Sequence, residues 1–367
     1  MIYLGLITAF SYTAALYLRG NNSAPMGFLG AKSYHPLAFV IPAILFTVFS
    51  GLRSGIGDTY FIMRSFAMLP DKPPFPVLFS REFIYRLLVY LLRSFTDRPQ
   101  LLIYIGAIFS CLPPIYFLYK NAYRYELAIF LFVTSGYYTF SFNGMRQYMA
   151  AGILLMGGDL LFTKERHSFL KYVLVVLLAS GFHRSALIML PIYFLVRRKA
   201  GANSILILLF LGALSPVALK VFLPQFLKFL SLVGFGIYEE SGWFTKGEEG
   251  GASVLRVLFA ALPPTLAWFS KEKLKESGEK AEYLVNLSFV NLFFYLLSLG
   301  NWIFARLAIY TEIYNLMLVP LLVEKAFKEK DRRKAYFASI VVYTVFFIGI
   351  SYSVREYRSN FFRTVFF

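Results

Sequence analysis

The chain of 367 residues combines 58% hydrophobic residues with a formal net charge of +17. A soluble domain of this length cannot bury so much apolar surface, and the mean hydropathy of +0.61 with 19% aromatic residues leads to the same exclusion. We therefore attribute the positive charge to basic loops beside a membrane and to anionic ligands, and we expect no nucleic-acid partner.

Apolar runs, many of them about 17–22 residues long, predict an all-α polytopic integral membrane protein, because a hydrocarbon layer is roughly 30 Å thick. We expect about 12 transmembrane or half-spanning helices in a single transmembrane domain over residues 1–367. The first run lacks a basic segment and a cleavage site, so it is interpreted as a retained span. The predicted segments are 1–18, 36–52, 100–119, 126–142, 147–163, 169–182, 185–196, 203–222, 252–270, 283–299, 302–323 and 335–353.

Two long connections interrupt this series. Residues 53–99 form a predicted extracytosolic loop, and within it arginines alternate with apolar residues over 78–95, as in an interfacial amphipathic helix. Glu82 and Arg86 in that segment are four residues apart and are interpreted as a solvated pair on the helix face. Residues 223–251 form a second predicted extracytosolic loop, with an apolar stretch followed by glycines and glutamates.

Lysine and arginine gather in alternate connections, so the positive-inside rule places those connections in the cytosol and both termini outside. This assignment of the connections to the two sides of the membrane depends on residues 169–196. As one helix they would measure about 42 Å, which is too short for two full spans and long for one. We favour a hairpin of half-spans that turns at 181–184, because it keeps the basic groups 164–171 and 197–199 on the same side.

With that topology, four basic sites reach the extracytosolic surface at similar depth and indicate one cavity for an anion. The first is the glycine-containing turn from Arg53 to Asp58, in which backbone N–H groups can approach a ligand. The alternative for this turn is a helix end with a structural ion pair. The second is Arg146-Gln147, at the start of a helix, where an N-terminus favours anions. An arginine whose charge reaches the lipid headgroups is the alternative there.

The third and fourth sites lie further along the chain. His183-Arg184 offers a titratable base beside a fixed cation within the hairpin. Arg306 lies about one turn inside its helix, and contact with headgroups is again the alternative. Glu312 in the same span is a functional candidate, or a structural partner for an arginine on another helix.

Cofactor chemistry finds no support in the sequence. Cys111 is the single cysteine and lies in an apolar run, and the three histidines are far apart. We therefore expect no disulfide, no metal site and no cofactor.

Together these sites resemble the EpsG family, the Wzy-like membrane proteins of bacterial exopolysaccharide assembly. The resemblance covers roughly residues 35–325 and is carried by segments 51–60, 145–150, 182–187 and 306–310 in matching order and spacing. One departure is visible, because this chain has Gly57-Asp58-Thr59-Tyr60 where family members often have Gly-Thr-Asp-Tyr.

The resemblance implies polymerisation of oligosaccharide repeat units carried on undecaprenyl pyrophosphate, at the extracytosolic side of the bacterial cytoplasmic membrane. It also implies a fold related to the GT-C membrane glycosyltransferases. Expected partners are the lipid-linked oligosaccharides, membrane lipids and other polysaccharide assembly proteins.

On this basis we expect an inverting, metal-independent glycosyl transfer. Arginines suit the binding of a pyrophosphate leaving group, and Asp58 or His183 would act as the base. The alternatives are a polysaccharide ligase, a non-catalytic flippase of the same lipid-linked oligosaccharide, or an assembly scaffold. The predicted pyrophosphate ligands are Arg53, Arg146, Gln147, Arg184 and Arg306.

Overall fold

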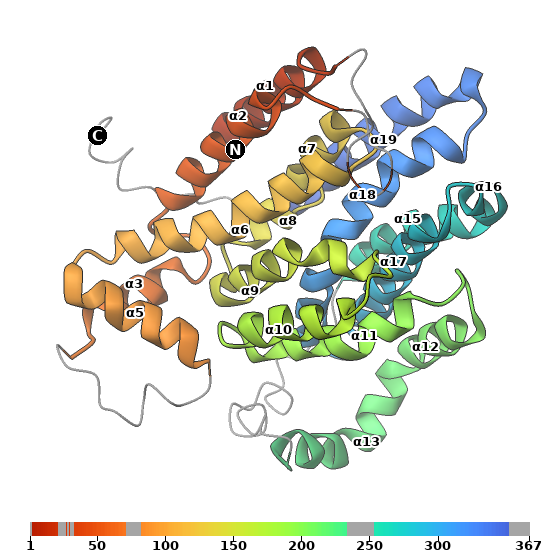
Figure 1. Cartoon of the computed structure of the whole chain (residues 1–367). Helices are drawn as coiled ribbons and strands as arrows, with labels where there is room; N and C mark the ends of the chain where they lie inside the picture. Colours follow the sequence, from red (N-terminus) through yellow and green to blue (C-terminus); the bar gives the residue numbers. More distant parts are fainter. Residues whose placement is uncertain are drawn as a thin grey trace. The chain divides into compact units, whose positions relative to one another are not determined.

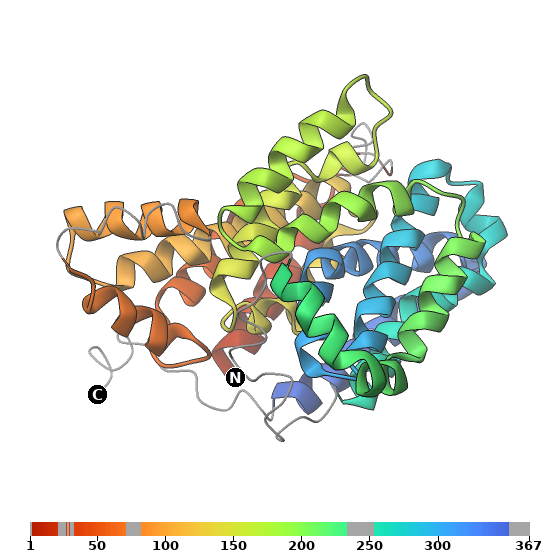
Figure 2. The same ribbon diagram turned by 90° about the horizontal axis from the view of Figure 1, so that it is seen from below.

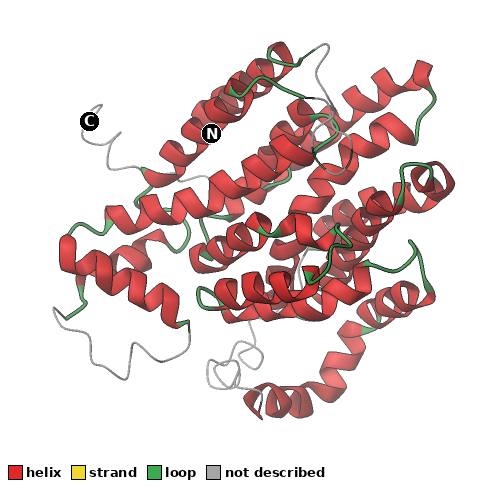
Figure 3. Cartoon of the chain, viewed as in Figure 1, coloured by secondary structure: helices red, strands yellow, loops and turns green. Residues whose placement is uncertain are grey.

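The structure, a computed structural model, describes residues 2–20, 27, 29, 33–70, 82–232 and 253–351. Within these ranges it is helical, with one isolated bridge between Arg19 and Tyr34 and no strand (Figure 3). This confirms the prediction of an all-α chain. Residues 78–81 of the predicted amphipathic helix and 233–251 of the second long loop lie outside the described residues.

The chain divides into two compact units, Met1–Tyr193 with Val319–Phe367 (unit 1), and Phe194–Leu318 (unit 2). Figure 1 labels their helices. Unit 1 contains α1 Ile2–Tyr17, α2 Leu37–Gly51, α3 Thr59–Ala67, α5 Phe83–Phe95, α6 Gln100–Asn121, α7 Tyr125–Thr134, α8 Tyr137–Phe140, α9 Met145–Met156, η1 Gly158–Leu161, α10 Ser168–Ser180, η2 Arg184–Ile188 and α19 Glu329–Ser351. Unit 2 contains α12 Asn203–Ala213, α13 Ser215–Leu230, α15 Val254–Phe269, α16 Lys271–Lys275, α17 Glu279–Leu297 and η4 Trp302–Ala308. Two helices cross the division, α11 Met189–Val196 and α18 Ile309–Lys325.

Three described stretches are long and apolar enough to cross a membrane alone, namely Gln100–Asn121, Trp302–Lys325 and Glu329–Ile350. Several shorter apolar helices accompany them, and many leucine, valine and phenylalanine side chains on their surfaces are exposed. Such surfaces suit lipid contact and indicate a membrane protein. The count of twelve spans stays a prediction.

Two predicted spans are each divided into two α-helices in the structure. The segment 126–142 forms α7 and α8, which are separated at Gly136, where φ is +90° and a side chain would be strained. The segment 203–222 forms α12 and α13, which are separated at Leu214. Pro216 follows at the start of α13, where its missing N–H costs no helical hydrogen bond.

Residues 169–196 form the expected hairpin. The chain reverses after α10, and the start of α10 meets the end of α11, where the Ser168 and Tyr193 hydroxyls lie 2.8 Å apart. The rings of Phe169 and Tyr193 are also in contact, with centroids 5.1 Å apart. Figure 1 labels α10 and α11, and Figure 2 gives the view from below. The prediction that 169–196 turns back on itself is confirmed.

Helix α6 is the centre of unit 1, because α2 and α9 both pack on it. Its first residue, Gln100, donates from Nε2 to the carbonyl oxygens of Gly51 (2.5 Å) and Arg53 (3.1 Å). Near its last turn, Lys120 pairs with Asp159. The 22 residues of α6 extend over about 33 Å, so they separate an Arg53 end of unit 1 from a Lys120 end.

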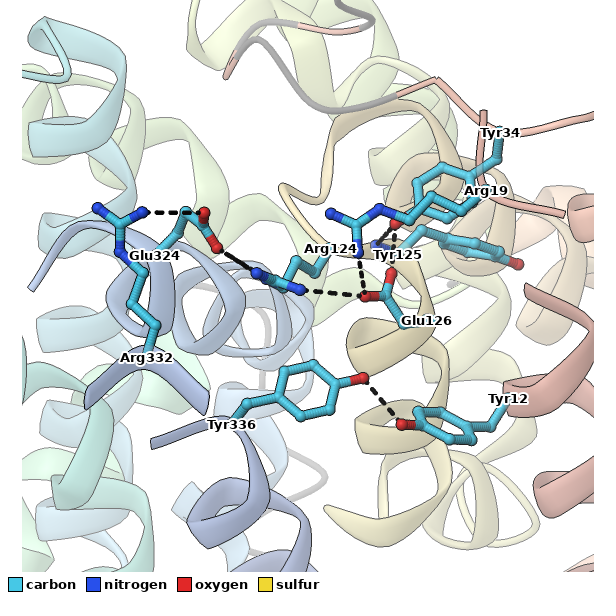
Figure 4. A network of polar contacts seen from close by, with 9 residues as sticks. All are labelled: Tyr12, Arg19, Tyr34, Arg124, Tyr125, Glu126, Glu324, Arg332 and Tyr336. Atoms are coloured by element: carbon cyan, nitrogen blue, oxygen red, sulfur yellow. Dashed lines mark hydrogen bonds and ion pairs between the residues drawn. The ribbon is translucent and has the colours of Figure 1, made fainter. Parts of the chain in front are cut away.

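At the Lys120 end, Glu126 is fully buried and holds several elements together (Figure 4). Its carboxylate lies 3.4 Å from the Arg19 guanidinium and 3.7 Å from that of Arg124, and it accepts a hydrogen bond from the Tyr34 hydroxyl. Burial, and then the neighbouring carboxylate, raise the pKa of Tyr34, so its hydroxyl stays protonated as the donor. A buried carboxylate needs such partners, because desolvation of an unpaired charge is costly.

The same network fixes the C-terminal helix. Arg124 also pairs with Glu324 of α18 at 2.7 Å, and Glu324 lies 3.5 Å from Arg332 of α19. The Tyr12 and Tyr336 hydroxyls, which lie 2.9 Å apart, connect α1 to α19 (Figure 4). Little of α19 is buried, so these polar contacts and its packing on α7 hold it in unit 1.

Buried amides link α17 and α18 in unit 2. Asn291 donates from Nδ2 to the carbonyl oxygen of Ala308 and to Thr311 Oγ1, both at 3.1 Å. Asn315 donates to Asn291 Oδ1 at 2.8 Å. Polar side chains in apolar helices are tolerated when they bond across the helix contact in this way.

We expect Glu126→Gln to destabilise the protein by roughly 3 kcal/mol, because it leaves two partly buried guanidinium groups facing a neutral amide. The matched control is Glu165→Gln, which removes the charge from an exposed pair with Lys171 and should change stability by less than about 1 kcal/mol. Unfolding of both purified variants in detergent measures the difference. Equal unfolding midpoints for the two variants would contradict a central role for Glu126.

Candidate functional site

Arg53 lies inside unit 1 and is fully buried. Its Nη1 donates to the Ser50 carbonyl oxygen (2.8 Å) and to Ser50 Oγ (2.5 Å), and its Nε donates to Thr59 Oγ1 at 3.0 Å. The guanidinium also lies over the Phe142 ring, 5.1 Å from its centroid. Arg53 therefore fastens the end of α2 to the start of α3, and a charge buried this deeply depends on these contacts.

Asp58 caps a helix that is distant in the sequence. Its Oδ2 accepts hydrogen bonds from the backbone N–H groups of Gly144 (2.7 Å) and Met145 (3.1 Å), at the N-terminus of α9. The Asp58 N–H donates to the Phe142 carbonyl oxygen at 3.2 Å. We expected this N-terminus to attract a ligand anion, but the protein's own carboxylate occupies it and accepts from two of its N–H groups.

Arg146 extends from the first turn of α9, and its side chain is 49% exposed. Its Nη1 donates to Glu82 Oε2 at 2.5 Å, and its guanidinium lies 5.5 Å from the centroid of the Tyr85 ring. Burial raises the pKa of Tyr85 to about 12 against the lowering effect of Arg146, so the phenol remains neutral. Arg146 thus places its positive charge at the surface, and Glu82 and Tyr85 hold its guanidinium in place.

The hairpin turn lies against the same group of residues. His183 Nδ1 and Ser185 Oγ are 2.7 Å apart, and Gln147 donates from Nε2 to the same hydroxyl at 3.4 Å. The backbone N–H of Arg184 donates to Glu82 Oε1 at 3.3 Å. Three of the four predicted basic sites are therefore connected by hydrogen bonds at one end of unit 1.

Glu82 corrects one prediction from the sequence. It is not a solvated residue on a helix face, because its side chain is only 14% exposed and it binds both Arg146 and the Arg184 backbone. The signal was its position as a lone acid between Arg81 and Arg86 in an aromatic segment. Ser185 was missed as well, although it follows the His183-Arg184 pair directly.

A pocket of about 460 Å³ adjoins Arg146, a volume within the range of ligand sites. Its walls combine two arginines and an aspartate with tyrosine and apolar side chains from α3, α5 and α6. The lining residues are Asp58, Phe61, Ile62, Ser65, Phe66, Leu69, Tyr85, Arg86, Val89, Tyr90, Leu102 and Arg146. The pocket therefore suits a ligand with both an anionic and an apolar part.

The remaining predicted residues belong to unit 2. Arg306 lies in η4 with its guanidinium 5.4 Å from the centroid of the Trp302 ring. Glu312 accepts a hydrogen bond from the Tyr295 hydroxyl at 2.7 Å, and Arg256 of α15 donates to that hydroxyl at 3.2 Å. Glu312 is thus linked through a tyrosine to an arginine on another helix. The convergence of Arg306 with the sites of unit 1 stays a prediction.

Metal ligands do not gather in the part of the chain that the structure describes. No group of three or more histidine, cysteine, aspartate or glutamate side chains lies close enough there to hold a metal ion. Cys111 is buried as a free thiol.

The sequence profile of the EpsG family matches residues 37–362, nearly the whole chain. The chain belongs to the EpsG family. The predicted resemblance is confirmed, and EpsG membership together with the apolar helices indicates a membrane protein with a polysaccharide-polymerase type of role. Searches of curated proteins and of solved structures returned no match.

We expect Gly57→Ala to destabilise the fold more than Gly144→Ala. Both glycines have positive φ, +61° and +89°, so alanine costs roughly 1–2 kcal/mol at either position. At Gly57 the new methyl group would also collide with the Phe142 carbonyl, whereas nothing lies near it at Gly144. Unfolding midpoints of the purified variants test this order, and equal losses would contradict the close approach at Gly57.

Proposed function

We propose that this EpsG-family protein polymerises oligosaccharide repeat units carried on undecaprenyl pyrophosphate, by inverting glycosyl transfer at the extracytosolic face of the bacterial cytoplasmic membrane. One observation carries the proposal. A half-exposed Arg146 and the His183 turn lie together at one end of unit 1, linked by Glu82 and Ser185. A cation and a titratable base are the two groups that this reaction requires.

In the proposed reaction, a hydroxyl of the incoming lipid-linked unit attacks the anomeric carbon of the growing glycan. A bond forms between that oxygen and the anomeric carbon, and the carbon's bond to the pyrophosphate oxygen breaks. The pyrophosphate leaves with the electron pair, and Arg146 and Arg184 stabilise its charge. His183 takes the hydroxyl proton, and Ser185 orients the imidazole through Nδ1.

The buried residues receive supporting roles in this proposal. Arg53, predicted as a phosphate ligand, is fully enclosed, so we assign it to holding the turn that carries Asp58. Asp58 fixes the N-terminus of α9 and thereby the direction in which Arg146 and Gln147 leave the helix. We propose Arg306 as a further phosphate ligand, and Glu312, which accepts from the Tyr295 hydroxyl, as a structural partner linked to Arg256.

The orientation in the membrane is proposed from the two ends of α6. Lys120, Arg124 and Arg332 lie at one end of unit 1, which the positive-inside rule assigns to the cytosol. The residues of the candidate site lie at the other end, near Gln100. This arrangement supports a site that faces the extracytosolic side.

Purified protein and synthetic lipid-linked repeat units should yield a ladder of longer glycans that survives EDTA. His183→Ala should slow chain growth by about 10²–10⁴-fold, the usual contribution of a general base. The control His35→Ala removes an exposed histidine at the opposite end of unit 1 and should leave the ladder unchanged. Movement of the lipid substrate across the membrane without chain growth would favour a flippase. Transfer of finished glycan to another acceptor would favour a ligase.

Asp58→Asn should retain chain growth, because an asparagine oxygen can accept the same backbone hydrogen bonds as an N-cap. Asp58→Ala should lose roughly 1 kcal/mol of stability together with activity, since the cap is removed. Parallel measurements of unfolding and chain growth separate the two variants. If Asp58→Asn folds normally yet makes no ladder, Asp58 rather than His183 is the base.

A further inference from the structure

Glu82 connects parts of the candidate site that are far apart in the sequence. One carboxylate oxygen accepts from the Arg146 guanidinium at 2.5 Å, and the other accepts from the Arg184 backbone N–H at 3.3 Å. Arg146 belongs to α9, and Arg184 follows His183 in the hairpin turn. The Glu82 carboxylate therefore bridges the Arg146 guanidinium and the backbone of the turn that carries His183.

The backbone of Glu82 adopts an uncommon conformation. Its φ of 59° and ψ of 45° lie in the left-handed region, which non-glycine residues rarely occupy. Its carbonyl oxygen nonetheless accepts from the Arg86 N–H at 3.2 Å and begins α5. Strain of this kind persists where the surroundings enforce it, and it occurs often at functional sites. Here the two hydrogen bonds of the side chain supply that enforcement.

The contact also leaves Arg146 open to a ligand. A guanidinium has five N–H donors, and the structure describes a hydrogen bond for Arg146 only to Glu82. The Tyr85 ring supports one face of the group, and half of the side chain is exposed beside the pocket. Glu82 therefore orients the arginine and leaves most of its donors available for phosphate oxygens.

Helix α5 is fixed to the hairpin by a second bond in the same place. The Tyr85 N–H donates to the Gly181 carbonyl oxygen at 3.0 Å, one turn beyond Glu82. Ile84 lies directly against Gly181, so a side chain added there would collide with it. The start of α5 is thus held on the turn that carries His183 by two hydrogen bonds to its backbone and by an apolar contact.

We propose that Glu82 is a positioning residue, which holds the Arg146 guanidinium in register with the His183 turn. The inference rests on the proposed function, because it takes Arg146 as a ligand of the lipid pyrophosphate. Its test uses undecaprenyl pyrophosphate in nanodiscs as the binding probe, and chain growth as a second readout. The variants are Glu82→Gln, Arg146→Ala and the double variant.

Glu82→Gln keeps the shape of the side chain and removes its charge. We expect binding of the probe to weaken about tenfold and chain growth to slow on the order of 10²-fold, because a small displacement of a reacting group is costly. In the Arg146→Ala background, Glu82→Gln should have no further effect on binding, since its contribution passes through Arg146. Asp97→Asn, which breaks an exposed ion pair with Arg93 at the end of α5, is the matched control and should behave as wild type.

Two results would overturn the proposal while leaving the proposed function intact. Additive losses in the double variant would show that Glu82 does not act through Arg146, and a lower unfolding midpoint of Glu82→Gln would then assign it to stability. Tighter binding by Glu82→Gln would show that the carboxylate competes with phosphate for Arg146. If the wild-type protein does not bind undecaprenyl pyrophosphate, the proposed function fails instead.

Discussion

The candidate site depends on one hydrogen-bonded contact, in which the Asp58 carboxylate accepts from the first N–H groups of α9. The first N–H groups of any helix lack partners within the helix, and burial makes them costly to leave unpaired. Asp58 supplies a partner from a turn 86 residues earlier in the chain. It thereby fixes where α9 begins, and Arg146 and Gln147 follow from that starting point.

The two ends of unit 1 solve the problem of buried charge in different ways. At the Lys120 end, Glu126 and Glu324 lie among three arginines, so each carboxylate has more than one cation near it. At the Arg53 end, the buried guanidinium is matched by neutral oxygens and an aromatic ring, while Glu82 pairs with the half-exposed Arg146. The first arrangement compensates charge within the protein. The second leaves the positive charge of Arg146 at the surface, where it suits an anionic ligand.

The sequence predicted the helices from local apolar runs, and the hairpin from the length of 169–196 and the basic groups on either side of it. Apolar runs of sufficient length mark helices, and the short spacing around Gly181 could hold one span or a turn, but not two full spans. The grouping of Arg53, Arg146 and His183 followed from loop charge. The role of Asp58 could not be read in this way, because a cap supplied from a distant segment leaves no periodic pattern. Glu82 was misread because its spacing to Arg86 fits a common helical pair equally well.

In the proposed reaction, the choice between Asp58 and His183 as the base depends on which groups the fold already engages. Both acids near the histidine turn are already engaged, since Glu82 holds Arg146 and the Arg184 backbone, and Asp58 Oδ2 caps α9. The other Asp58 oxygen is buried, with no hydrogen-bond partner among the described residues, although Asp58 itself lines the pocket. His183 is partly exposed, and its Nδ1 lies 2.7 Å from the Ser185 hydroxyl. We therefore keep His183 as the proposed base, because proton transfer to its ring requires no change in the bonds that Glu82 and Asp58 make.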